Sequence, residues 1–247
     1  MSQAVIVCEG YTDRAFWKGC LAHLECSEPR SRGGVKDPWG LPVKRGQHAY
    51  TSRGGGFIRV VRAGGKANVL PRVRLFLHGH STHPVRRLIV NVYSDTSAGE
   101  VDAETGIGAS HLLGEIRRIY PDAHQASASP CDIDTGAGAI VSLVRWKVVD
   151  PDVRLPAQQT LERLVCSAIA RSYPERAEIV QAWLDSRRDA PPSSAKSYSW
   201  SYMAGWDADA GCEFFYTNLW NDRRVTEELV SLLSPSGAWD AVKALAQ

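Results

Sequence analysis

The sequence lacks several features that would assign a protein to a class at once. No run approaches the ~20 apolar residues of a transmembrane helix, and AVIVC near the start is too short for a secretory signal. The six cysteines show no CxxC spacing, so we expect reduced thiols in a cytoplasmic protein rather than disulfides or a zinc site. The net charge is only +2, so any basic surface must be local. We therefore expect a globular protein with no membrane partner.

A nucleotide-binding P-loop is also missing. The glycine-rich segment GGGFIRVVRAGGKA (54–67) lacks the first glycine at the required spacing, and Lys66 is followed by Ala67 instead of Ser or Thr. The chain therefore carries no ATPase motif of its own.

Short apolar runs and amphipathic segments alternate through about the first 150 residues. Strands are predicted at 3–10, 56–64, 86–95 and 139–150, and helices at 12–24, 68–79 and 110–120. Such alternation predicts an α/β fold with a parallel sheet flanked by helices. After Pro151 the pattern is helical, with helices predicted at 157–171, 175–187, 196–206, 222–233 and 236–246. We therefore divide the chain into an α/β core over 1–150 and a helical extension over 151–247.

Residues 27–56 interrupt the core with a basic insertion rich in glycine, proline and serine. A loop of this length inside a domain is usually functional or disordered. Its cations and rings suit contacts with nucleic acid, although a solvated segment would have the same composition. The candidate contacts are Lys36, Lys44, Arg45 and Arg53. The later segment CDID (131–134) is interpreted as a loop.

Two acidic residues follow apolar strands, and a third lies one helical turn further along. Glu9 and Asp95 should lie at the carboxyl edge of the sheet, where open parallel sheets bind ligands. Thr12 or Asp13 is expected to cap a helix that buries Ala15, Phe16 and Leu21.

Gathered at one edge without compensation, the three carboxylates of Glu9, Asp13 and Asp95 would repel one another. Mg²⁺ prefers oxygen ligands and keeps phosphate oxygens in its shell, so the sequence predicts a magnesium site that receives phosphate.

The segments VIVCEGYTDRAFW (5–17) and LIVNVYSDTSAG (88–99) together resemble the Toprim domain of topoisomerases, primases and overcoming-lysogenization-defect nucleases. Glu9, Gly10 and Asp13 match the family's EGxxD motif. Its later DxD motif is incomplete: Tyr93-Ser94-Asp95 lacks the first aspartate, and the alternative register Asp95-Thr96-Ser97 lacks the second.

The resemblance extends to features of the nuclease branch. Those nucleases carry an S-x-E motif on a helix after the sheet and a downstream lysine, and Thr160, Glu162 and Lys196 occupy these places here. The resemblance implies a catalytic role for Glu9 and for Lys196, which would neutralise charge on phosphate. Because such nucleases often carry an ATPase, it also implies a separate ABC- or SMC-type ATPase partner.

The resemblance further implies two Mg²⁺ or Mn²⁺ ions about 4 Å apart, acting on the attacking and leaving oxygens. Its implied ligands are Glu9, Asp13 and Asp95 for one ion, and Glu162 with Thr160 for the other.

The expected function is that of a Mg²⁺-dependent Toprim-type endonuclease, an anti-phage defence effector with DNA favoured over RNA as substrate. Two alternatives stay open. The first is a degenerate Toprim module that binds nucleic acid or a protein, with Tyr93 marking lost chemistry, and the second is phosphotransfer on a nucleotide. The sequence does not determine the oligomeric state, and a homo-oligomer is one option.

Overall fold

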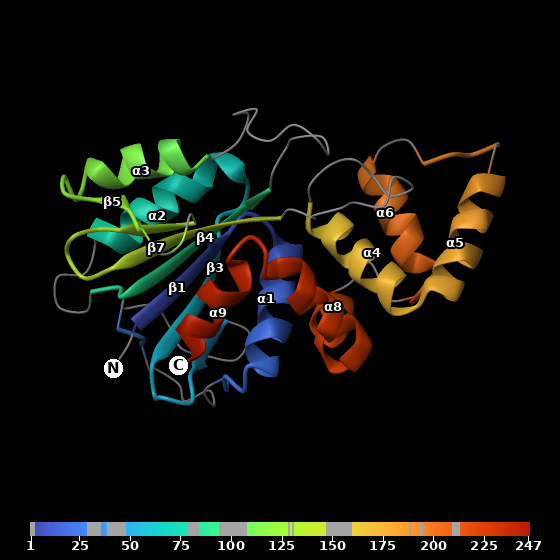
Figure 1. Ribbon diagram of the computed structural model, residues 1–247, viewed down its shortest axis with the longest axis horizontal. Helices are drawn as coiled ribbons and strands as arrows, with labels where there is room; N and C mark the ends of the chain where they lie inside the picture. Colours follow the sequence, from blue (N-terminus) through green and yellow to red (C-terminus); the bar gives the residue numbers. More distant parts are fainter. Residues whose placement is uncertain are drawn as a thin grey trace.

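The computed structural model describes most of the chain, in segments separated by gaps. The described residues are 3–28, 36–38, 48–78, 84–93, 108–127, 129, 131–146, 160–187, 189–192, 195–208 and 213–247. Figure 1 shows one twisted sheet with helices on both faces and a further group of helices at the right of the view.

The strands assemble into one mixed sheet. They are β1 (Gln3–Cys8), β2 (Ala49–Thr51), β3 (Phe57–Arg62), β4 (Arg87–Tyr93), β5 (His124–Gln125), β6 (Asp132–Asp134) and β7 (Ile140–Trp146). Within the described residues their order is β2-β3-β1-β4-β7-β6-β5. The central strands β3, β1, β4 and β7 are parallel, which confirms the predicted parallel core. The edge strands β2, β5 and β6 pair antiparallel.

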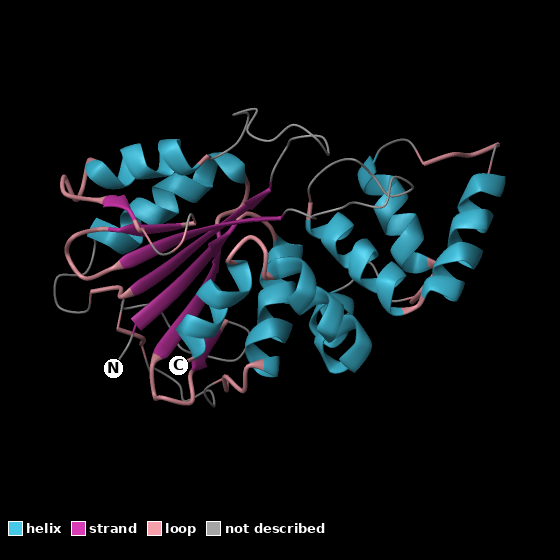
Figure 2. Ribbon diagram, in the orientation of Figure 1, coloured by secondary structure: helices cyan, strands magenta, loops and turns pink. Residues whose placement is uncertain are grey.

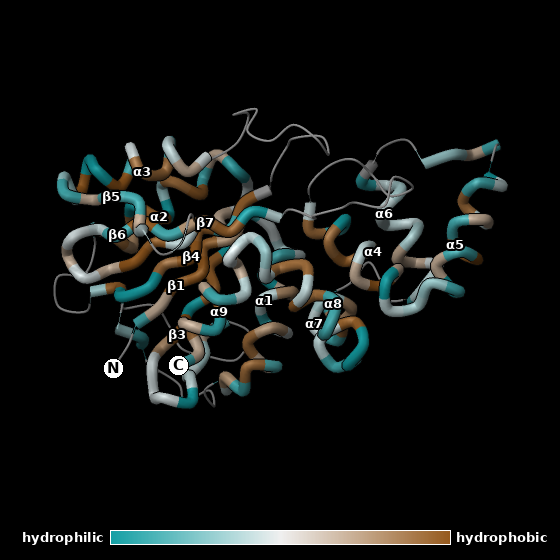
Figure 3. Tube along the Cα trace, in the orientation of Figure 1, coloured by the Kyte–Doolittle hydropathy of each residue, from teal (hydrophilic) through white to brown (hydrophobic). Residues whose placement is uncertain are grey.

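The two faces of the sheet bury separate sets of side chains. Val5 and Val7 pack on one face, whereas Ile6 and Cys8 pack on the other. The covering helices are α2 (Val69–His78) and α3 (Ala109–Arg117) on the first face, and α1 (Tyr11–His23) and α9 (Ala238–Ala246) on the second. Burial on both faces explains why the central strands are continuous apolar runs, seen in brown in Figure 3.

The predicted C-terminal extension is helical. Its helices are α4 (Leu161–Ser172), α5 (Pro174–Ser186), α6 (Ala195–Ala204), α7 (Glu213–Asn218), η2 (Leu219–Asn221), α8 (Arg223–Leu233) and α9. Helix α7 packs against α1, and α9 packs against β7 and β4. Helices α4, α5 and α6 pack on one another beyond the sheet, at the right of Figure 2. All the described strands precede the predicted boundary at residue 150, and only helices are found after it in the described residues. One apolar cluster contains side chains from both sides of this boundary.

The start of α1 differs from its prediction. Gly10 is the N-cap, so the expectation that Thr12 or Asp13 caps the helix is wrong. Asp13 acts from the third helical position and accepts a hydrogen bond from the Gly10 backbone N–H at 2.8 Å. The predicted burial of Ala15, Phe16 and Leu21 is confirmed.

The basic insertion at 27–56 is partly built into the sheet. It contains β2, whose Thr51 also bridges to Ser27, so the end of the insertion is a strand rather than a loop. Asp37 and Arg59 of β3 form a buried ion pair at 2.5 Å. The interpretation of residues 131–134 as a loop is wrong too, because Asp132–Asp134 forms β6. These strands of two or three residues are too short to show an alternating pattern.

Among the described residues no helix combines the length and the apolar character that crossing a bilayer requires. Cys8, Cys20, Cys26, Cys131 and Cys166, the cysteines in these segments, are free.

Candidate active site

Glu9 occupies the turn that follows the central strand β1. Its side chain is half-buried, and its backbone carbonyl accepts hydrogen bonds from the N–H groups of Gly64 and Gly65, both at 3.1 Å. These glycines follow β3 and have φ of +81° and +119°, a region that glycine enters without strain. Their hydrogen bonds hold the turns after β1 and β3 together, which places Glu9 at the carboxyl edge of the parallel strands.

Two arginines add positive charge near this edge. Burial raises the pKa of the Cys8 thiol, Asp13 raises it further, and Arg14 and Arg62 partly offset the rise. Arg62 is paired in register with Cys8 across β3 and β1, and Arg14 lies in the first turn of α1, so both are near the end of β1. Arg14 Nε is buried and makes no hydrogen bond to the described part of the chain, while Arg62 is exposed. Arginines placed in this way suit an anionic ligand beside Glu9.

Asp13 lies beneath this turn and is only 1% exposed. One carboxylate oxygen accepts from the indole Nε1 of Trp146 at 2.6 Å, and the other accepts from Gly10 N at 2.8 Å. Trp146 is the last residue of β7, so Asp13 joins the start of α1 to the carboxyl end of another strand. Each oxygen thus has a structural partner.

The floor beneath Asp13 is a stack of aromatic rings around a buried amide. Trp17 and Trp146 stack with centroids 5.4 Å apart, and Phe16 meets both rings edge-on. Trp17 Nε1 donates to Asn91 Oδ1 at 2.9 Å, and Asn91 Nδ2 donates to the Val144 carbonyl at 3.2 Å. Both indole N–H groups and both ends of the Asn91 amide are therefore hydrogen-bonded, which favours one fixed arrangement of the floor.

Glu162 and Lys196, which the Toprim resemblance singled out, contact each other. Glu162 in the first turn of α4 is 1% exposed, and its Oε1 lies 3.5 Å from Lys196 Nζ on α6. That oxygen makes no hydrogen bond within the described residues, and the Lys196 side chain is 58% exposed. Thr160 caps α4, where its hydroxyl accepts from Arg163 N at 3.4 Å. The pair joins a buried carboxylate to a cation that reaches solvent.

Tyr216 of α7 connects the two acidic regions. Its ring is fully buried, and burial raises the pKa of its hydroxyl, with further contributions from Glu162, Cys166 and Asp13. Helix α7 packs against α1, which carries Asp13, and the Tyr216 hydroxyl lies 4.0 Å from Met203 Sδ on α6, the helix that carries Lys196.

Other predicted site residues are not brought into this group. Asp95, Lys44 and Arg45 lie outside the described residues. Lys36 is exposed beside the buried Asp37, and Arg53 is exposed and pairs with Glu25. The nucleic-acid contacts assigned to these cations stay predictions.

The donor chemistry fits a hard cation. Glu9 and Glu162 offer carboxylate oxygens, the ligands that Mg²⁺ and Mn²⁺ prefer, whereas both oxygens of Asp13 already accept hydrogen bonds. No group of three such ligands occurs within the described residues alone. The predicted ligand Asp95 lies outside these residues, so the site of three carboxylates stays a prediction.

Reasoning from sequence missed the residues that hold this region together. Trp17, Asn91 and Trp146 carry its hydrogen bonds and ring contacts, and Tyr216 of α7 is buried nearby. A signal was available for Trp17, because it stands four residues after Asp13 and shares its helix face. No local sequence pattern indicates that Trp146 is the partner of Asp13 or that α7 packs against α1.

Comparison with known proteins gives a fold relative but no family. No protein-family model matches the chain, and no curated protein gives a significant match. The chain is similar to the crystal structure of hypothetical protein PH0156 from Pyrococcus horikoshii OT3, with a TM-score of 0.71, 16% identity and full coverage of both chains. The two chains share a fold. At this identity the likeness carries no activity from one protein to the other.

Proposed function

We propose that this protein is a metal-dependent nucleic-acid endonuclease of the Toprim type. The observation that carries the proposal is the pairing of Glu162 with Lys196. A carboxylate that is 1% exposed and paired with a half-exposed lysine is typical of a functional site, since burying a charge is costly for a purely structural role.

The proposal gives each residue a task. Glu9 and Glu162, with Asp95, would hold the cation or cations, which supply a water of lowered pKa and polarise the phosphate. Lys196 leaves Glu162 when phosphate arrives and neutralises its charge. Arg14 and Arg62 attract the nucleic-acid backbone toward Glu9. Action on DNA, a defence role, a separate ATPase and a cytoplasmic location rest on the resemblance and the composition alone.

A second candidate is a non-catalytic Toprim-like module that binds nucleic acid. Both oxygens of Asp13 already accept hydrogen bonds, and Tyr93 stands where the family has an acid. These two departures favour a weakened metal site.

A plasmid-nicking assay with Mg²⁺ or Mn²⁺ separates the two candidates. We expect wild-type protein to nick, and Glu9→Gln and Glu162→Gln to lose more than about 100-fold of the rate, since even outer-shell partners of metal ligands are worth roughly 10–100-fold. Glu178→Gln, at an exposed acid of α5, is the matched control and should keep the wild-type rate. Wild-type protein that binds DNA without cleaving it favours the second candidate. Equal nicking by wild type and Glu9→Gln refutes the site.

A further inference from the structure

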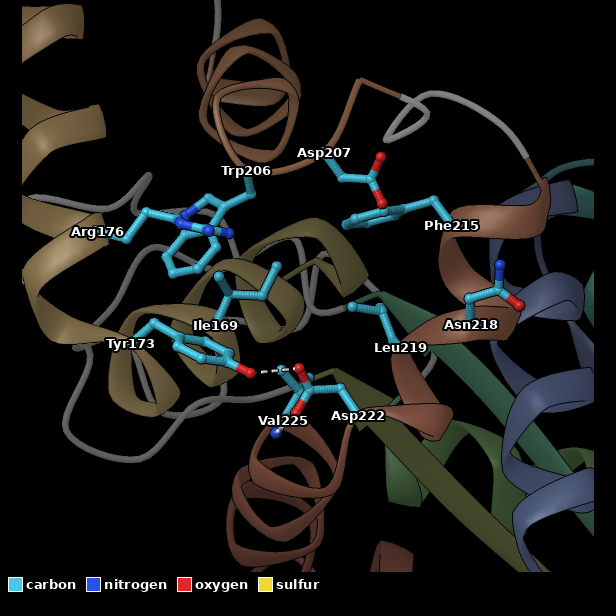
Figure 4. A pocket seen from close by; sticks show the side chains of 10 residues that line it. All are labelled: Ile169, Tyr173, Arg176, Trp206, Asp207, Phe215, Asn218, Leu219, Asp222 and Val225. Carbon is cyan, nitrogen blue, oxygen red and sulfur yellow. Dashed lines mark hydrogen bonds between the residues drawn. The ribbon is translucent and has the colours of Figure 1, made fainter.

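A second concave site lies among the C-terminal helices, apart from the residues assigned above. The cavity has a volume of about 250 Å³ and lies between α4, α7, α8 and the residues at the start of α5 and after α6. Ile169, Leu219 and Val225 form its apolar floor. Figure 4 shows Tyr173 and Trp206 on one side and Phe215 on the other, with Ile169 and Leu219 between them.

Two arginines lie over the aromatic walls. The Arg176 guanidinium is 5.0 Å from the Trp206 ring centroid, and the Arg224 guanidinium is 5.5 Å from the Tyr173 centroid. Both arginines are exposed. A guanidinium stacked on a ring keeps its N–H groups at its edge, where they can bind phosphate oxygens.

The wall beside Arg224 is fixed in place before any ligand binds. The Tyr173 hydroxyl donates to Asp222 Oδ2 at 2.5 Å, while Asp222 Oδ1 caps α8 by accepting from Arg224 N and Val225 N. That hydrogen bond also raises the pKa of Tyr173. Asp222 therefore positions the ring, and the cost of ordering this wall is already met.

Trp206 carries an unused donor. Its indole Nε1 is buried and makes no hydrogen bond to the described part of the chain. A buried donor without an acceptor is costly, and native proteins usually explain one by a ligand or water. A carbonyl or ring nitrogen on a ligand in this cavity would satisfy it.

From these features we propose that the cavity binds one unpaired nucleobase, with the neighbouring phosphates on Arg176 and Arg224. The volume lies below the roughly 300–1,000 Å³ of sites for drug-sized ligands, so it suits a single ring system. Aromatic walls beside arginines are the usual platform for single-stranded nucleic acid. The inference rests on the proposed function in taking this ligand as part of the nuclease substrate, which then has a single-stranded region.

The test measures binding without cleavage. The full chain is titrated, without divalent cation, into a fluorescent single-stranded oligonucleotide of mixed sequence and into an abasic strand of equal length. Fluorescence anisotropy reports the Kd. We expect Trp206→Ala to weaken binding of the normal strand by roughly 5- to 100-fold, as for one stacked base, and to leave the abasic strand little changed.

Arg176→Ala should weaken both strands and flatten the log–log salt dependence by about 0.7 unit, as for one phosphate contact on a single strand. Because Arg176 is exposed, Arg176→Ala should fold, so this variant still tests the proposal if Trp206→Ala does not fold. Trp183 and Arg187 on the outer side of α5 form a matched control, with the guanidinium 5.5 Å from a ring that is 44% exposed and lies outside the cavity. Trp183→Ala and Arg187→Ala should bind as wild type does.

Wild-type protein that binds neither strand, or that prefers neither strand over the other, overturns the proposal. An Arg176→Ala variant with unchanged affinity and unchanged salt dependence also overturns the proposal. That result is expected if the cavity binds a peptide instead of a nucleobase. Weaker binding by Trp206→Ala and Arg176→Ala, together with unchanged nicking by Glu9→Gln, would support the nucleobase site and refute only the nuclease site.

Discussion

Asp13 and Glu162 are equally buried, each 1% exposed, yet the two regions around them differ. Around Asp13 the partners are fixed donors of the fold, Trp146 Nε1 at 2.6 Å and Gly10 N at 2.8 Å. Around Glu162 the ion-pair partner found among the described residues is Lys196 at 3.5 Å, on a side chain that is 58% exposed and able to move away.

Burial alone therefore does not distinguish a structural carboxylate from a functional one. A buried charge with rigid partners holds elements together, and removing either side leaves an unpaired polar group. A buried charge whose partner reaches solvent can exchange that partner for another cation. Asp13 thus fixes the turn that carries Glu9, whereas we propose that Glu162 belongs to the reacting site.

The largest expected effect is that of Asp13→Asn. The amide NH₂ of asparagine would face either the Trp146 or the Gly10 N–H, a donor against a donor. We expect the free energy of unfolding to fall by roughly 2–4 kcal/mol, from a buried unsatisfied donor and a weakened cap. Urea unfolding measures this loss. Asp240→Asn is the control, because that carboxylate is 74% exposed, and equal losses in both variants would contradict the structural role of Asp13.

A buried group that stays neutral extends the comparison. His48 is 4% exposed, and burial with the nearby Arg14, Lys18 and Arg59 lowers its pKa to about 4 from an ordinary 6.5, against an opposing effect of Glu213. Between these two values the unfolded chain binds a proton that the folded chain does not. Stability should therefore fall as pH drops from about 6.5 to 4, by up to about 3 kcal/mol.

The variant His48→Asn isolates this contribution. Asparagine accepts the positive φ of 52° at this position and does not titrate. We measure the free energy of unfolding in urea at several pH values. The value for wild type minus the value for the variant should fall as pH drops from about 6.5 to 4. A difference that stays constant from pH 7 to pH 4 would show that His48 is not held neutral.

Lys196→Gln tests the movable half of the pair. Without the ammonium the Glu162 carboxylate stays buried with a weaker partner, so we expect a loss of roughly 1–2 kcal/mol, less than for a fully buried pair because Lys196 is half-exposed. Lys243→Gln, which breaks an exposed pair with Asp240, should cost less. Thermal unfolding measures the stability lost by each variant. A larger loss for Lys243→Gln than for Lys196→Gln would contradict the proposed importance of the Glu162–Lys196 pair.

The smallest effect on stability is expected for Glu162→Gln. The amide oxygen keeps its contact with the Lys196 ammonium while a buried charge is removed, so the free energy of unfolding should change by less than about 1 kcal/mol or rise. This is the opposite of the outcome for Asp13→Asn, although both changes replace a carboxylate by an amide of the same shape. A loss from Glu162→Gln as large as that from Asp13→Asn in the same urea titration would remove the distinction.

Much of the fold follows from local patterns in the sequence. The apolar run AVIVC predicted β1, similar runs predicted β4 and β7, and the alternation in GFIRVVRAG predicted β3. The short strands β2 and β6 lacked such a pattern, since their pairing with β3 and β7 depends on partners distant in sequence. Helix α7 was missed for the same reason: six residues packed against α1 leave no clear period.

The candidate site could be predicted only in part. Glu9 was placed from its position after a strand, and Glu162 with Lys196 from the order of motifs in the Toprim resemblance. The structural role of Asp13 could not be foreseen, because it depends on Trp146 at the end of a strand far along the chain. The sequence records which residues are acidic, but the donor that meets each acid is set by tertiary packing.

Calorimetric titration with Mn²⁺ measures whether Glu9 and Glu162 hold a cation. We expect wild-type protein to bind the ion, Glu9→Gln and Glu162→Gln to weaken binding by at least about tenfold, and Glu178→Gln to bind as wild type does. Unfolding curves run alongside confirm that each variant is folded. Equal Mn²⁺ affinity in all four proteins, or no binding by the folded wild type, would contradict the assignment of a cation site to Glu9 and Glu162.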